Sequence, residues 1–502
     1  MKKKNLAGNI VLLITLTMLL KCMGFVNRII IAYFYGTTNL TDIYYNASGF
    51  VDSISSILLA SLAVGVINIY ITNKKNGNND RFLSNLIVVI FVIMTAIGFF
   101  VFIGSNKIVY ILAPGNNADE RTLLCNMLRI MCITFPFQGI IAVYSAVLQA
   151  EKNFMPVKLT GTMTSVISII CVTLLAKYFG TTALVVSYIC SIIFNAGFLI
   201  FNARKIYKFV PKSILRDSDL KKLLILIIPL LLGTAGHEVN LIIDKSIASQ
   251  IAKGAISALS YSCVLYLFIE NVIINSIVTA IFPELAEKKN SNGDKELCRT
   301  TIKTIYLAEF LLIPIVICTF FSATDITKIV YMRGSFDRTS LVLTSAALRG
   351  YVLGLPFLAL RDIVTRVYYT YGDTKKPVII NLIAVGLNII LDIVLSKHMG
   401  ILGITLSTSI SNAFSGCFLV ILVKSHNKYM VNKSFIKNIL KIFIAVLPIA
   451  FCDFIIVNNL NGIFKILLSI ILSFILQIIA ILGMKIIKID DIKRMLQLVK
   501  GR

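Results

Sequence analysis

Side chains that catalyse reactions or hold transition metals are scarce in this sequence of 502 residues. It has 3 histidines, and its 10 cysteines are scattered singly, with no CxxC pair and no Cys/His cluster. That pattern predicts neither a disulfide framework nor a zinc site. The chain also has no Ser/His/Asp set and no loop long enough to fold as a separate domain. These absences disfavour an enzyme, and they place any function within or between apolar segments.

Apolar residues, by contrast, are in large excess. They make up 57% of the chain, more than a soluble protein needs. About 14 apolar stretches reach the roughly 20 residues that a bilayer-spanning helix requires. We therefore predict an all-α polytopic membrane protein. The expected spans are 8–33, 44–73, 82–104, 121–149, 156–178, 182–203, 220–249, 255–284, 300–322, 340–369, 377–397, 402–424, 435–457 and 463–486.

Positive charge is distributed unevenly along the chain. The net charge is +25, and Lys and Arg concentrate in alternate loops such as 204–222, 284–303 and 424–441. This is the positive-inside pattern of a membrane protein, so topology and not nucleic-acid binding explains the charge. An even number of spans with a basic N-terminus predicts that both termini are cytoplasmic. The basic tail, 488–502, is expected to lie on the anionic inner leaflet.

Similar residues recur in the two halves of the chain at an offset of about 220 positions. The matching positions are Gly115, Pro136, Pro156 and Gly180 in one half and Gly334, Pro356, Pro377 and Gly400 in the other. Two six-helix halves are typical of secondary transporters, in which the substrate passes between the halves. The predicted domains are an N-lobe, 1–212, a C-lobe, 213–430, and a segment, 431–502, with two extra helices and the basic tail. Pro136, Gly354 and Pro356 lie inside expected spans, where transporter helices bend, although close helix packing explains glycine equally well.

Several short motifs follow one another along spans 1 to 12. They are Gly24-Phe25, Tyr35-Gly36, Thr41-Asp42, Ala113-Pro114-Gly115, Leu148-Gln149-Ala150, Phe154, Pro156, Gly254 to Tyr261, Phe282-Pro283, Arg333 to Asp337, and Asp373 to Pro377. In this order the motifs resemble those of the MurJ (MviN) lipid II flippases, within the multidrug/oligosaccharidyl-lipid/polysaccharide exporter superfamily. The resemblance implies two six-helix lobes around a central cavity. It also implies transport of a lipid-linked glycan precursor across the bacterial cytoplasmic membrane.

The resemblance further implies a cavity whose arginines bind the substrate's diphosphate, but this chain departs from that pattern. Lys21 stands where the family's first arginine is expected, and Asn27-Arg28 replaces an Arg-Asp pair. Two other cavity arginines align with Ser55 and Val264. Lys21 and Arg28 remain as candidate phosphate ligands, since both carry the charge that phosphate recognition needs.

Acidic residues appear in the same part of the chain. Asp52, Glu238 and Glu270 are the additional candidates for the substrate site, and charges within spans are expensive enough to suggest a function. The alternative is that these acids form internal ion pairs with Lys21 and Arg28 and hold the lobe together.

A second candidate site would hold a cation. Asn388 and Asp392 are four residues apart in span 11 and share one helix face. Their oxygen ligands suit a hard cation. The resemblance adds Asp244 of span 7 and Thr408 of span 12, because sodium-binding members use these four positions. Na⁺ is the favoured coupling ion, H⁺ is the alternative, and plain helix–helix hydrogen bonding is the third interpretation.

Three functions remain to be compared. The first is flipping of an undecaprenyl-diphosphate-linked precursor, with lipid II foremost, by a monomer that uses alternating access. The second is export of another lipid-linked oligosaccharide or of an amphiphilic small molecule, which the altered cavity supports. The third, a membrane enzyme such as a polyprenyl glycosyltransferase, lacks any motif or domain in this sequence.

Overall fold

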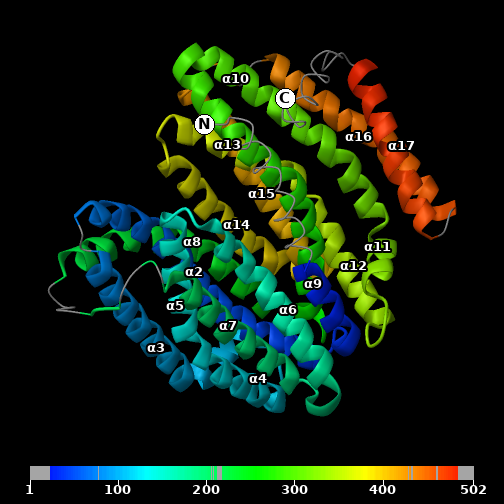
Figure 1. Cartoon of the computed structure of the whole chain (residues 1–502). Coiled ribbons are helices and arrows are strands. Elements are labelled where there is room, and N and C mark those ends of the chain that lie inside the picture. The colour runs from blue at the N-terminus through cyan, green and yellow to red at the C-terminus, as the bar shows by residue number, and fades with distance from the viewer. Residues whose placement is uncertain are drawn as a thin grey trace. The chain divides into compact units, whose positions relative to one another are not determined.

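Every described element of the computed structural model is helical (Figure 1). The structure describes residues 23–483 apart from 77–78, 205, 207–208, 212–216, 428, 431–432 and 460–461. A short helix, Met23–Tyr35, comes first. The elements after it are α2 (Asn39–Asn76), α3 (Asn79–Leu112), α4 (Ala118–Met131), η1 (Cys132–Thr134), α5 (Phe135–Ala150), α6 (Phe154–Phe179), α7 (Thr182–Ala203), α8 (Ser218–Ala248), α9 (Ala255–Ile269), η3 (Glu270–Ile274), α10 (Asn275–Phe321), α11 (Ala323–Tyr331), α12 (Arg338–Val352), α13 (Leu355–Thr370), α14 (Lys375–Met399), α15 (Ile401–Leu422), η4 (Val423–Ser425), α16 (Lys433–Asn459) and α17 (Ile463–Gly483).

The predicted fold class is confirmed, and the described part of each expected span lies on one or more of these helices. Within the described residues, 10 helices are long and apolar enough to cross a membrane, or 11 if the bent pair α12–α13 counts as one span. The expected span 121–149 breaks into α4, η1 and α5 just before Pro136, and the span 340–369 bends by 40° before Pro356. Proline lacks the amide that would continue the helix, so both breaks fall where the sequence placed proline.

The chain forms two compact units. The first, here the N-terminal unit, comprises the described residues up to Ser257 together with Arg333–Asp337. The second, here the C-terminal unit, comprises Ala258–Met332 and the described residues from Arg338 onward. In the N-terminal unit α2 packs on α5 and α8, and α6 pairs with α7; in the C-terminal unit α14 pairs with α15, and α16 with α17.

Motifs that are far apart in sequence meet inside the N-terminal unit. The carboxylate of Asp42 accepts hydrogen bonds from the amides of Gly254 and Ser257, both at 2.7 Å, and from the Ser257 hydroxyl at 2.6 Å. Asp42 therefore caps the first turn of α9 from 212 residues away, where the helix amides have no partner of their own. The Thr41-Asp42 and Gly254–Ser257 motifs are two sides of one contact.

A second pair of motifs meets where the segment Arg333–Asp337 contacts the end of the first helix. The Ser335 amide donates to the Tyr33 carbonyl at 2.8 Å, and its hydroxyl donates to the Phe34 carbonyl at 3.0 Å. A Cβ on Gly36 would lie 2.3 Å from the Ser335 carbonyl oxygen, so only glycine permits this approach.

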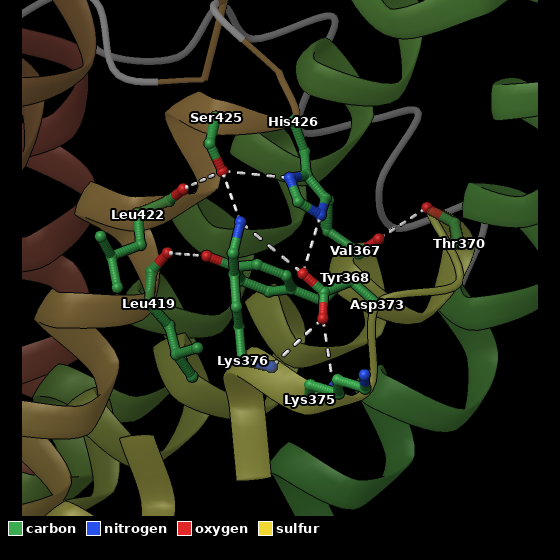
Figure 2. A network of polar contacts seen from close by, with 10 residues as sticks. All are labelled: Val367, Tyr368, Thr370, Asp373, Lys375, Lys376, Leu419, Leu422, Ser425 and His426. Carbon is green, nitrogen blue, oxygen red and sulfur yellow. Dashed lines mark hydrogen bonds and ion pairs between the residues drawn. The ribbon is translucent and has the colours of Figure 1, made fainter. Parts of the chain in front are cut away.

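The turn between α13 and α14 is tied to the end of α15 by a polar network (Figure 2). One carboxylate oxygen of Asp373 accepts from the amides of Lys375 and Lys376 at 3.1 and 3.2 Å, and the other lies 2.9 Å from His426 Nε2. The Lys376 ammonium donates to the Ser425 hydroxyl at 2.8 Å. Asp373 therefore both starts α14 and fixes it against η4.

The last two helices hold polar groups on their inner face. Asp453 of α16 is fully buried, and its carboxylate accepts from the hydroxyls of Ser469 at 2.6 Å and Ser473 at 2.9 Å on α17. Lys465, four residues before Ser469, forms an ion pair of 2.5 Å with Asp325 of α11. Such internal pairing is how polar groups are accommodated between membrane helices.

Candidate substrate and cation sites

Charged side chains gather in the N-terminal unit where the first helix, α2 and α8 approach Tyr45. The guanidinium of Arg28 lies over the Tyr45 ring, 4.7 Å from its centroid. The ammonium of Lys245, on α8, donates to the Tyr45 carbonyl oxygen at 3.1 Å. Asp52 follows two turns later on α2 and lies in the electrostatic field of Arg28, Lys245 and Glu238. The predicted residues Arg28, Asp52 and Glu238 are therefore brought together.

Asp52 is held by a chain of neutral donors. Tyr188 of α7 donates its hydroxyl to Asp52 at 2.7 Å, and Gln138 of α5 donates its amide to Tyr188 at 3.0 Å. Tyr188 and Gln138 are buried, whereas Asp52 is exposed although it lies within a membrane-length helix. Because its side chain is exposed, this carboxylate can meet a ligand, as a binding-site group must.

Two predicted substrate residues lie elsewhere. Lys21 is outside the described residues. Glu270 belongs to the C-terminal unit, where it begins the π-helical turn η3, half-buried on the same helix as Tyr266. A π-helical turn inserts one extra residue into a helix and is found frequently at functional sites. The segment that begins at Glu270 is thus a real irregularity of the helix.

The cation candidates Asn388 and Asp392 lie on the buried stripe of α14. Their side chains are 3% and 0% exposed. The amide oxygen and nitrogen of Asn388 make no hydrogen bond to any described residue. A buried amide without a partner is costly, so this position fits a bound cation that the amide oxygen would ligate.

Thr408 lies half-buried on α15, and its hydroxyl donates to the Ile404 carbonyl one turn earlier at 3.4 Å. Gly400 reverses the chain between α14 and α15, and Gly403 packs directly on the Leu395 backbone. The two helices that carry Asn388, Asp392 and Thr408 therefore pack against each other. The remaining candidate, Asp244, belongs to the N-terminal unit and is 4% exposed on α8.

Asp244 has a neighbour that the sequence interpretation missed. Asn240, one turn earlier on α8, donates its amide to the Asp244 carboxylate at 3.2 Å. The Asn240 amide oxygen makes no hydrogen bond in the described chain. Asn240-x-x-x-Asp244 therefore repeats the arrangement of Asn388-x-x-x-Asp392, and the repeat was visible in the sequence. Lys245, Tyr45, Tyr188 and Gln138 were also missed, because only the fold brings them to Asp52.

The helical bundle, the charged cluster at Tyr45 and the buried amide–carboxylate pairs are features of a polytopic membrane transporter. The family model "Lipid II flippase MurJ" matches residues 31–480. The chain belongs to this family, a family of transporters and not of enzymes.

Curated relatives and solved structures agree with that assignment. The chain is 27% identical over 415 residues to the probable lipid II flippase MurJ of Rickettsia prowazekii, covering 80% of each chain. It is 23% identical over 459 residues to a counterpart in Buchnera aphidicola subsp. Baizongia pistaciae, covering 88% of each. A solved lipid II flippase MurJ in an inward closed conformation shares the fold at a TM-score of 0.82 and 23% identity, over 94% of this chain and 98% of that one. An inward-facing MATE multidrug transporter matches at a TM-score of 0.69 over 82% of this chain and 95% of that one.

Proposed function

We propose that this protein flips lipid II, the lipid-linked precursor of peptidoglycan, from the inner to the outer leaflet of the bacterial cytoplasmic membrane. The observation that carries the proposal is the charged cluster at Tyr45, where Arg28 approaches from one helix and Lys245 from another. Guanidinium and ammonium groups recognise phosphate oxygens by charge-assisted hydrogen bonds. Family membership makes a diphosphate-linked lipid the fitting ligand.

The proposed cycle is alternating access. The headgroup enters from the cytoplasm and its phosphates bind at Arg28 and Lys21, while the lipid tail stays in the bilayer. The two lobes, 1–212 and 213–430, then rock so that the substrate site faces outward. The pair α16–α17, which follows the two lobes in sequence, borders the lipid tail in this proposal. The protein works as a monomer with both termini in the cytoplasm.

A coupling ion fits the second site. Asn388, Asp392 and Thr408 would hold Na⁺ through oxygen atoms, and the ion would balance the charge of a buried carboxylate. Asp244 is the further ligand that the family resemblance implies. Asp244 and Asp392 are buried on helices, which keeps their carboxylates out of water. The membrane potential adds about 2.3 kcal/mol per charge per 100 mV to drive the return step. H⁺ is the alternative ion.

One observation favours a second substrate class. Asp52 and Glu238 stand beside the cations, and the site at Ser55, where the family pattern has arginine, is buried and uncharged. A less cationic substrate site suits a different lipid-linked oligosaccharide or an amphiphilic small molecule. This alternative predicts transport activity without lipid II flipping.

Complementation tests the proposal directly. A cell's own lipid II flippase is depleted, this chain is expressed, and externally accessible lipid II is measured. Rescue by the wild type, and loss of rescue in Arg28→Met but not in Lys253→Met, is the expected result; Lys253 is a matched cation that pairs with Glu120 instead. Failure of the wild type, with the protein present in the membrane, would overturn lipid II as the substrate in favour of the second class.

A further inference from the structure

Lys245 occupies a slot that the sequence of α2 keeps open. A Cβ built on Gly49 would lie 1.7 Å from the Lys245 ammonium nitrogen and 3.1 Å from its Cε. Glycine in the interior of a helix costs about 0.5–1 kcal/mol relative to alanine, so it needs a local reason. Here the missing side chain lets the lysine of α8 reach the backbone of α2 at Tyr45.

The ammonium in this slot is not neutralised by the carbonyl that accepts its hydrogen bond. A backbone carbonyl carries no net charge, and Lys245 also acts electrostatically on Asp52, which Tyr188 and Gln138 hold in place. Arg28 lies over the ring of Tyr45 and acts on Asp52 as well. Two cations thus contact Tyr45, one at its ring and one at its carbonyl oxygen, near an exposed carboxylate.

Resting on the proposed function, we propose that Lys245 is a second ligand of the substrate's diphosphate. Arg28 binds one phosphoryl group and Lys245 the other, and the incoming diphosphate takes the place that Asp52 holds beside the two cations. Lys245 thereby supplies charge that the arginines at the positions of Ser55 and Val264 no longer supply. The substrate class is a lipid-linked diphosphate, and the residue that binds it is Lys245 of α8.

The chemistry predicts a difference between mono- and diphosphate ligands. One cation binds one phosphoryl group, and a second phosphoryl group adds to the binding affinity only if a second cation binds it. Removing Lys245 should therefore reduce binding of a diphosphate far more than binding of a monophosphate. General loss of positive charge would weaken both ligands alike.

The test uses the full-length protein in nanodiscs, with radiolabelled undecaprenyl diphosphate and undecaprenyl phosphate as probes. Lys245→Met is expected to weaken diphosphate binding by roughly tenfold to a hundredfold, the range for losing a hydrogen bond to a charged group. Monophosphate binding should change by less than about threefold. Lys245→Arg should restore most of the diphosphate affinity, and Lys253→Met should change neither probe.

Gly49→Ala separates the position of the charge from its presence. The new methyl group would push the flexible end of Lys245 out of its slot without removing the ammonium. Diphosphate affinity should fall by less than in Lys245→Met, and the double variant should bind no more weakly than Lys245→Met alone, because neighbouring residues that act through one contact are not additive. An additive double variant would place the effect of Gly49 outside this slot and overturn the argument from it.

The outcomes distinguish this inference from the proposed function. If Lys245→Met binds undecaprenyl diphosphate within twofold of the wild type while the wild type flips lipid II, the inference is wrong and the function stands. If the wild type binds the diphosphate through Lys245 but does not flip lipid II, the inference stands and the proposed function is wrong. Competition by inorganic pyrophosphate as strong as that by the lipid would identify a free-diphosphate site and overturn a lipid-linked ligand.

Discussion

Two aspartates of the C-terminal unit, Asp392 and Asp453, are both 0% exposed within membrane-length helices. Asp453 is satisfied inside the protein, because Ser469 and Ser473 donate to both of its carboxylate oxygens. Asp392 stands one turn from Asn388, whose amide makes no hydrogen bond to the described residues. Burial is therefore the same at the two sites, whereas the polar surroundings differ.

This difference separates a structural acid from a candidate ligand. A buried polar group normally has its partners, and one whose neighbours are left without partners requires an explanation such as an ion. The helix pair α16–α17 uses Asp453 to join two helices. The helix α14 instead buries the Asn388 amide with no hydrogen bond to the described residues, one turn from Asp392.

The largest expected effect comes from removing the negative charge of the predicted cation ligands, in comparison with removing that of Asp453. Asp392→Asn should abolish the sodium dependence of transport, since it removes a charged ligand, and Asp244→Asn should do the same. Asp453→Asn should leave sodium dependence unchanged. The measurement is lipid II flipping in proteoliposomes with an inward or outward Na⁺ gradient or none. Normal sodium dependence in both Asp392→Asn and Asp244→Asn would contradict the cation site.

The second expected effect concerns the stability that the two serines give to the buried carboxylate of Asp453. Ser469→Ala/Ser473→Ala removes both donors from a fully buried carboxylate and should lower the free energy of unfolding by about 1–3 kcal/mol. Replacing the acid as well, in Asp453→Leu/Ser469→Ala/Ser473→Ala, should recover most of that loss, because no polar group is then left unsatisfied. Unfolding in mixed micelles measures both. Equal stability of the double variant and the wild type would show that these bonds contribute nothing.

The sequence predicted the membrane helices because their signal is local. Continuous apolar length identifies a span, and Pro136 and Pro356 show where two spans break. Asn388 and Asp392 were also predicted, since four residues along one helix determine a shared face. Their relation to Asp453 was not, because the two serines that satisfy it lie on the next helix.

The residues around Asp52 were harder to predict for the same reason. Tyr188 and Lys245 reach α2 from 136 and 200 residues away, and nothing in the spacing of the sequence records those contacts. Gly49 was the available local signal, as a glycine inside a long helix. Interpreting it required knowing which side chain fills the space above it.

A third, smaller effect extends the comparison to Asp52, an exposed acid with both cations and donors around it. Asp52→Asn keeps the hydrogen bond from Tyr188 but removes the negative charge beside Arg28 and Lys245. Binding of undecaprenyl diphosphate should tighten by roughly threefold to tenfold, because the ligand no longer competes with a resident carboxylate. Tyr188→Phe, which removes the donor but keeps the charge, is the matched control. Weaker binding in Asp52→Asn would mean that this acid contacts the substrate favourably.

The smallest effect is expected at Asp373, an acid outside the membrane spans whose satisfied carboxylate resembles that of Asp453 (Figure 2). Burial acts to raise the pKa of Asp373, but the Lys376 amide and the charges of His426 and Lys376 outweigh it and lower the pKa below its ordinary value. A lowered pKa means that the carboxylate stabilises the folded state above about pH 4, the ordinary pKa of aspartate, and that this contribution is lost as pH falls further. Hydrogen exchange in the turn 371–376 should therefore become less protected between about pH 4 and pH 3, relative to the intrinsic rate. Asp373→Asn should abolish the pH dependence of this protection, and a wild type with equal protection at both pH values would show that the network in this turn does not depend on the charge of Asp373.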